Sequence, residues 1–211
     1  MISLRLKTLA DLIPARAKVI DVGADHGLLS IYLVSNKLAQ KVLATDINAS
    51  ALNNVKKKIE GRGLNIKTEL ADGLHGINLQ DYDTVVISGL GGLTINKILI
   101  DSKQLSRIKQ VVLQPTNKLP EVRKHMAQLG YYLANEVIIK EHNKFYVNLQ
   151  YLKNHKKNPK FIQKWGLLNN QEYVQDLIER RIKILDKLHI NNKKSQLLLA
   201  EIAELKEFIN K

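Results

Sequence analysis

The sequence predicts a Rossmann-like α/β fold followed by an antiparallel, coiled-coil-like helical hairpin. Over roughly the first 150 residues of the chain, short apolar runs alternate with stretches of helical spacing. Such an alternation builds a mostly parallel sheet with helices on both faces. Two strand-like runs at the end of this region are joined by a few polar residues, which permits only an antiparallel pair. Beyond that pair the spacing is purely helical.

Each element is predicted from its own apolar spacing. The strands are expected at residues 18–22, 41–45, 65–70, 84–87, 110–113, 133–139 and 145–151. The helices are expected at residues 27–38, 49–59, 93–101 and 119–129, with an amphipathic one inside residues 1–14. A parallel sheet that ends in a hairpin is typical of class I methyltransferases rather than of plain dinucleotide-binding domains.

The C-terminal segment predicts a second structural unit. Apolar residues step by three and four over 174–188 and again over 195–209, with a polar turn at Asn191-Asn192 between them. This spacing is that of two antiparallel helices. We therefore expect one domain at residues 1–152 and a basic helical hairpin at residues 153–211. A cap packed on the sheet and a protruding arm both fit the hairpin's sequence.

Composition limits the classes of function. The net charge of +13 favours a polyanionic partner, although a lysine-rich compositional bias would produce the same excess. No apolar run is long enough to span a membrane. The absence of cysteine excludes disulfides and cysteine-ligated metals, and no metal-binding cluster is apparent among the scattered histidines. We expect a cytoplasmic protein that binds no membrane and has no evident obligate protein partner.

The turn after the first strand predicts the cofactor. Asp21, Gly23 and Asp25 stand in a D-x-G-x-D-x-G run that opens a helix, and Asp46 ends the second strand, where a carboxylate can bind a ribose diol. The run lacks the middle glycine of the dinucleotide motif G-x-G-x-x-G. Its carboxylates would repel a pyrophosphate, but they would attract the cationic sulfonium and ammonium groups of S-adenosyl-L-methionine (SAM). The sequence therefore favours SAM over NAD.

Two further turns complete the expected site. Asp72-Gly73 follows the third strand and supplies an acceptor for the adenine amino group, unless Asp72 only forms the turn. The fourth strand runs into a cluster that contains Gly89, Gly91 and Gly92, which leaves room for cofactor or a flat substrate but also suits a flexible turn. The N/D-P-P-Y/F motif of enzymes that methylate amino groups is absent there.

Several motifs together resemble one family. They are DVGADHGLLSIYL at 21–33, DGL at 72–74, SGLGG at 88–92, LQP at 113–115, and the series Glu136, Glu141 and Tyr146. This set resembles the bacterial TrmK family, the SAM-dependent enzymes that methylate N1 of the adenine at position 22 of tRNA, and the resemblance extends over the whole chain. Ser30 stands where the family more often has proline.

The resemblance implies a substrate and a role for each residue. Adenine N1 has a free in-plane lone pair, so Asp25 is expected to stabilise the charge that develops on the base, with His26 as a second catalytic candidate. The cofactor is expected to contact Asp21, Gly23, Asp46, Ile47, Asp72, Gly73 and Gly89. The tRNA is expected to contact Arg5, Gly91, Gly92, Lys156, Lys157 and Arg180, with the cofactor carboxylate as the alternative partner of Arg5. Methylation of another RNA and a non-catalytic RNA-binding protein are the alternative functions.

Overall fold

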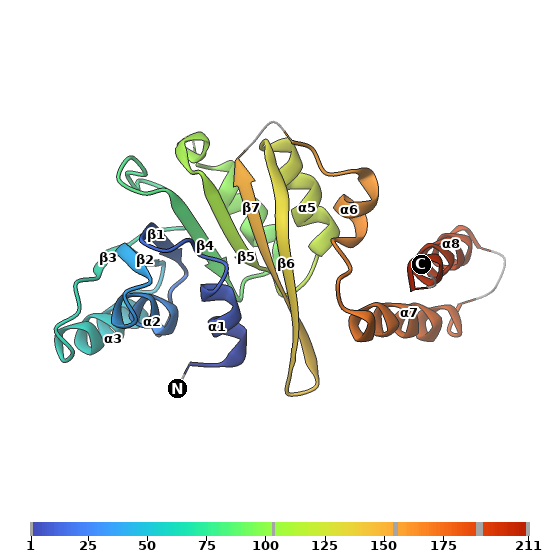
Figure 1. Cartoon of the computed structure of the whole chain (residues 1–211), viewed down its shortest axis with the longest axis horizontal. Coiled ribbons are helices and arrows are strands. Elements are labelled where there is room, and N and C mark those ends of the chain that lie inside the picture. The colour runs from blue at the N-terminus through green and yellow to red at the C-terminus, as the bar shows by residue number, and fades with distance from the viewer. Residues whose placement is uncertain (1, 103, 154–155, 189–191, 210–211) are drawn as a thin grey trace. The chain divides into compact units, whose positions relative to one another are not determined.

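A seven-stranded mixed sheet forms the centre of the first structural unit (Figure 1). The computed structural model describes residues 2–102, 104–153, 156–188 and 192–209. The strand order is β3-β2-β1-β4-β5-β7-β6, and β1 to β5 run parallel while β7 is antiparallel to both of its neighbours. The strands are β1 Ala17–Val22, β2 Ala39–Asp46, β3 Lys67–Leu70, β4 Thr84–Ser88, β5 Gln110–Gln114, β6 Tyr131–Glu141 and β7 Lys144–Lys153.

Helices cover both faces of this sheet. On one face α1, α2 and α3 pack on a core that includes Val19, Val42, Val86 and Val112 from four successive strands of the sheet. On the other face α4 packs against α5. The helices of this unit are α1 Leu4–Ala10, α2 Leu28–Ser35, α3 Ala49–Glu60, α4 Gly92–Ile100, the 3-10 turn η1 Leu105–Arg107, α5 Leu119–Gln128 and α6 Lys160–Trp165.

The predicted α/β fold and its terminal hairpin of strands are confirmed, and one helix was not predicted. The first compact unit is Met1–Leu167, whereas we expected a boundary after residue 152. The additional segment contains α6, which packs on α5. The Arg123 guanidinium of α5 donates to the Lys164 carbonyl of α6 at 3.3 Å and forms a fully buried ion pair with Glu136 at 2.9 Å.

The second compact unit, Leu168–Lys211, contains the predicted helical hairpin. Its helices are α7 Gln171–Leu185 and α8 Lys193–Ile209. Residues from both helices are buried, and Arg181 of α7 is joined to Glu201 of α8 by an ion pair of 2.8 Å. Asn191, in the predicted turn, lies outside the described residues. None of the helices described in either unit is both long enough and apolar enough to cross a membrane.

Candidate cofactor and substrate site

A cavity of about 590 Å³ lies where the parallel strands β1, β2 and β4 end. Open α/β sheets bind their ligands at this edge, because the turns after the strands meet there. Four carboxylates face the cavity, from Asp21, Asp25, Asp46 and Asp72, together with the guanidinium of Arg5. These five residues were predicted for the site from the sequence, and Gly23, His26, Ile47, Gly73 and Gly89 line the same cavity.

The Asp46 carboxylate organises the turn that follows β1. Its Oδ2 accepts a hydrogen bond from the Asp25 backbone N–H at 2.9 Å, and its Oδ1 accepts one from the Asn48 N–H at 2.9 Å. Asp25 has a left-handed backbone conformation, with φ of 49°, and the bond to Asp46 helps to hold it there. Each carboxylate oxygen has a second lone pair, so Asp46 can still accept from two hydroxyl groups of a ligand.

Asp21 is the buried acid of the cavity. Only 3% of the residue is exposed, and its Oδ2 accepts a hydrogen bond of 2.7 Å from the Ser30 hydroxyl. Burial raises the pKa of Asp21 from 3.8 to about 6, and the hydrogen bonds from Ser30 oppose this effect only in part. A buried carboxylate that is difficult to ionise is stabilised by a cation placed beside it.

Asp25 and His26 lie at the mouth of the cavity. Their side chains are 70% and 62% exposed, and the His26 Nε2 is 3.6 Å from the Asp25 Oδ2. The backbone carbonyl of His26 accepts a hydrogen bond from Lys58 of α3. Both side chains are thus accessible to a large substrate, while the backbone that carries them is fixed to its neighbours.

Arg5 reaches the cavity from the short N-terminal helix α1. Its Nη1 donates to Gln114 Oε1 at 2.6 Å, and its Cζ lies 5.6 Å from the centre of the Tyr146 ring. Gln114 is buried at the end of β5. The sequence singled out Gln114 and Tyr146 only as parts of motifs, because their contacts with Arg5 join residues that are far apart in the chain.

Other residues expected at the site lie elsewhere in the structure. Gly91 and Gly92 are absent from the cavity lining described for this chain. The Gly92 N–H donates to Asn117 Oδ1 at 3.0 Å, and a Cβ on Gly92 would lie 2.6 Å from the Asn117 carbonyl oxygen. Glycine therefore permits the start of α4 to pack closely against the loop after β5. The assignment of Gly91 and Gly92 to substrate stays a prediction.

Besides Arg5, three basic residues were expected to contact tRNA, and they are distributed over both units. Lys156 and Lys157 border a separate hollow of about 430 Å³, beside Gly130 and Tyr131. Tyr131 begins β6, which places this hollow at the amino ends of the parallel strands, on the opposite edge from the cofactor cavity. Arg180 belongs to α7 in the second unit and forms an ion pair of 2.7 Å with Asp176. Their role toward tRNA also stays a prediction.

Several cavity residues were not predicted from the sequence. Leu28, Ala71, Leu90, Thr94 and Ile98 also line the cavity. Leu28 and Ala71 closely follow strands whose positions were predicted, so their place in the chain could have indicated them. Thr94 and Ile98 lie on one side of α4, and only the packing of that helix brings them to the cavity.

Comparison with known proteins gives the family. Residues 2–149 match the protein family that is described as methyltransferase domain. The tRNA (adenine(22)-N(1))-methyltransferase of Bacillus subtilis is 34% identical over 148 residues, which are 69% of this chain and 62% of that protein. The match therefore spans less than two thirds of that relative's length.

Two solved structures resemble the chain over nearly its whole length. TrmK of M. capricolum, in complex with S-adenosyl-homocysteine (SAH), is 28% identical with a TM-score of 0.88, and the match covers 100% of this chain and 98% of that one. A Streptococcus pneumoniae protein in complex with SAM is also 28% identical, with a TM-score of 0.85 and coverage of 98% and 99%. The chain belongs to the methyltransferase-domain family and, within it, to the TrmK family.

Proposed function

We propose that this protein transfers the methyl group of SAM to N1 of the adenine at position 22 of tRNA. The observation that carries the cofactor assignment is the cavity itself, in which four carboxylates and one guanidinium surround a space of about 590 Å³. SAM has two cationic centres, a ribose diol and one carboxylate. The relatives named above support the choice of tRNA and of adenine N1.

Each part of SAM has a suitable partner in the cavity. Asp46 would accept from the ribose hydroxyls, and Asp72 with Gly73 would lie beside the adenine amino group. Ile47 has 69% of its surface exposed and offers an apolar contact for the adenine ring. Asp21 would stabilise the cationic end of the cofactor. Gly23 and Gly89, both with positive φ, let the backbone approach the ligand closely.

The reaction needs alignment more than proton transfer. SAM supplies an electrophilic methyl group, which is attacked by the adenine N1 lone pair. A new N–C bond forms as the S–C bond breaks, and the positive charge passes to the purine. Asp25 is exposed at the cavity mouth, where its carboxylate would stabilise that charge or accept a proton from the base's amino group. His26, whose Nε2 is 3.6 Å from Asp25 Oδ2, would orient Asp25 or the base.

The proposal also assigns contacts with tRNA to residues that lie outside the cofactor cavity. N1 lies on the Watson–Crick edge of adenine, so a paired adenine must leave its stack before it reacts. Lys156 and Lys157 on the first unit and Arg180 on the helical hairpin would bind phosphates of the tRNA. A tRNA substrate agrees with the cytoplasmic location expected from the sequence.

The test is to map the methyl group. The purified protein is incubated with tRNA and isotope-labelled SAM, and the RNA is digested and analysed by mass spectrometry. We expect one methyl group, on N1 of adenine 22, and none on a transcript with guanine at that position. Methylation of ribosomal RNA in place of tRNA would support the alternative substrate, and binding of tRNA without transfer would support a non-catalytic role.

Asp25 gives a more specific test of the chemistry. Asp25→Ala should bind SAM and tRNA nearly as well as the wild type but turn over at least about 100-fold more slowly, the usual contribution of a group that stabilises transition-state charge. The matched control is Asp101→Ala, which removes an exposed carboxylate at the end of α4. Full activity of Asp25→Ala would refute the catalytic assignment.

A further inference from the structure

The β6–β7 hairpin extends past the edge of the sheet where the cofactor cavity lies (Figure 1). β5 pairs with β7 only as far as Leu149, opposite Leu113 near the end of β5. The pairing of β6 with β7 continues beyond this point to Glu141 and Lys144. The outer part of the hairpin therefore projects from the carboxyl end of β5, next to the turns that form the site.

Helix α1 is attached along this projecting part. Glu141 accepts a hydrogen bond from the Leu4 N–H at 3.0 Å, and Asn148 donates to the Arg5 carbonyl at 3.2 Å and to the Thr8 hydroxyl at 2.9 Å. Asn148 is fully buried, so this connection is protected from water. Arg5 consequently lies between the cavity, which it lines, and the hairpin.

A row of cationic and aromatic groups leads outward from Arg5. The Tyr146 ring centre is 5.6 Å from the Arg5 Cζ and 5.2 Å from the Lys144 Nζ. Lys144 is exposed and Tyr146 is partly exposed. We name Arg5, Tyr146 and Lys144 the rim row. The cavity within it is acidic and suits a cationic cofactor, whereas the rim row is basic and suits an anion.

Base flipping creates a need that such a row can meet. When one nucleotide leaves a stack, its neighbour loses a stacking partner on one face. Proteins that hold single-stranded nucleic acids place aromatic rings against bases and cations against phosphates. The Tyr146 ring contacts two cations, and one of them, the Arg5 guanidinium, also lines the reaction cavity, so the rim row has this chemistry.

We propose that the rim row binds the nucleotide adjacent to the methyl acceptor: the exposed Lys144 ammonium moves from the Tyr146 ring to the phosphate, and the base stacks on the ring in its place. This inference rests on the proposed RNA methyltransferase function. The ring would hold the strand open while the acceptor base occupies the cavity. Gln114 acts as a positioning residue, because it fixes the Arg5 guanidinium from the inner side.

The experiment compares tRNA affinity with cofactor affinity in four variants. Affinity for tRNA is measured by filter binding with SAH present, so that no turnover occurs, and SAH affinity is measured by calorimetry. Tyr146→Leu keeps apolar volume but removes the ring and should weaken tRNA binding about tenfold, whereas Tyr146→Phe should bind within about twofold of the wild type. Neither variant should change SAH affinity.

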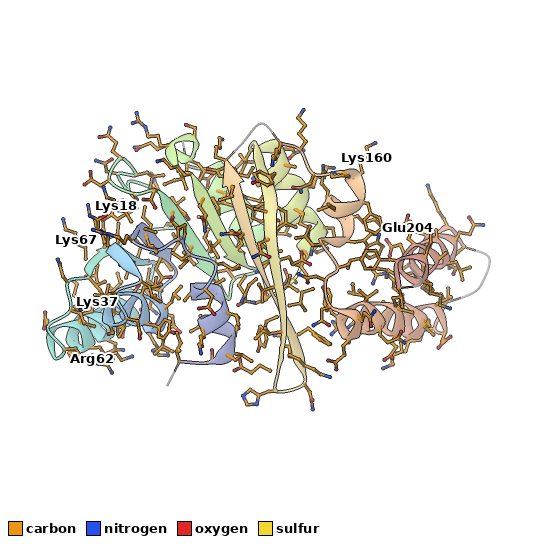
Figure 2. The ribbon with its side chains drawn as sticks, viewed as in Figure 1. Lys18, Lys37, Arg62, Lys67, Lys160 and Glu204 are labelled. Atoms are coloured by element: carbon orange, nitrogen blue, oxygen red, sulfur yellow. The ribbon has the colours of Figure 1, made fainter. Side chains whose placement is uncertain are left out.

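The charge of the row is tested by Lys144→Glu. This variant should also weaken tRNA binding, and it should reduce the dependence of the logarithm of affinity on the logarithm of salt concentration by about one. Lys67→Glu is the matched control, because Lys67 is an exposed lysine on β3, at the opposite end of the sheet from the hairpin (Figure 2). It should have a smaller effect on both quantities.

Distinct results would overturn the inference. Unchanged tRNA affinity in Tyr146→Leu would remove the stacking role, and an equal loss in Tyr146→Phe would assign the effect to the hydroxyl group. Loss of SAH affinity in Tyr146→Leu would mean that the ring only supports Arg5 in the cofactor site. If the wild type binds tRNA but transfers no methyl group, the proposed function fails, while the comparison of variants still decides whether the row binds RNA.

Discussion

Replacing Asp21 with asparagine should stabilise the cofactor-free protein while weakening its hold on SAM. Burial raises the pKa of Asp21 from 3.8 to about 6, so the folded chain binds this proton more tightly than the unfolded chain does. The contribution to stability is therefore fully present below pH 3.8 and is lost as the pH rises through about 6. At pH 8 the ionised Asp21 carboxylate makes the cofactor-free protein less stable than it would be with Asp21 protonated.

The size of the effect follows from the pKa difference. At about 1.4 kcal/mol for each tenfold change in proton affinity, the rise from 3.8 to about 6 corresponds to about 3 kcal/mol. Asparagine is uncharged and can still accept the hydrogen bond of the Ser30 hydroxyl. Asp21→Asn should therefore be more stable than the wild type at pH 8 by up to about 3 kcal/mol, with the difference disappearing toward pH 4.

The assay is urea unfolding of both proteins without cofactor at several pH values between 4 and 8. Calorimetric titration with SAM over the upper part of this range should show wild-type affinity falling as the pH drops through about 6. Affinity of Asp21→Asn should be lower and should not change there. Ser30→Ala removes a hydrogen bond to the carboxylate and should move the wild-type profile to higher pH. A variant less stable than the wild type by the same amount at every pH would refute the reasoning.

Three other predictions concern the stability of the fold. Gly92→Ala should destabilise the fold by about 1–3 kcal/mol in denaturant unfolding, since its Cβ would lie 2.6 Å from a backbone oxygen, whereas at Gly91 the nearest atom is 3.6 Å away and alanine should be tolerated. Arg123→Leu should cost about 3–5 kcal/mol because it removes the guanidinium from a buried ion pair with Glu136. Lys41→Leu should cost much less, because its partner Asp81 is largely exposed to water. Asn48→Ala should cost about 1 kcal/mol in thermal unfolding, because the Asn48 side chain caps α3; equal melting temperatures would show that the cap is replaced by water.

The order of the strands along the chain could be predicted because buried strands are short apolar runs between turns. The six residues of α6 could not, because they follow a polar basic stretch and depend on packing against α5. The strand boundaries were all predicted within about two residues. β6 continues outward past its apolar part to Glu141, which accepts a hydrogen bond from the Leu4 N–H of α1.

The acidic part of the site could be predicted because each carboxylate lies at the end of a strand or shortly after it. The glycines at 91 and 92 could not be interpreted in the same way, because a glycine that faces a ligand and one that packs against the chain look alike in a sequence. The contact of Arg5 with Gln114 joins residues that are 109 positions apart, and no local pattern reports it.

The attachment of α1 also bears on the order in which the protein can mature. Arg5 is synthesised well before Asn148, which holds its carbonyl and follows 143 residues later. Gln110 and Gln150, which both donate to the Leu12 carbonyl, follow 98 and 138 residues after it. Contacts of such separation form late in folding, because they require the closure of a long loop. The carboxylates of the cavity can be assembled from the first half of the chain, but the Arg5 guanidinium cannot be secured until β7 is in place. A nascent or truncated chain would therefore have the acidic half of the site without the basic half.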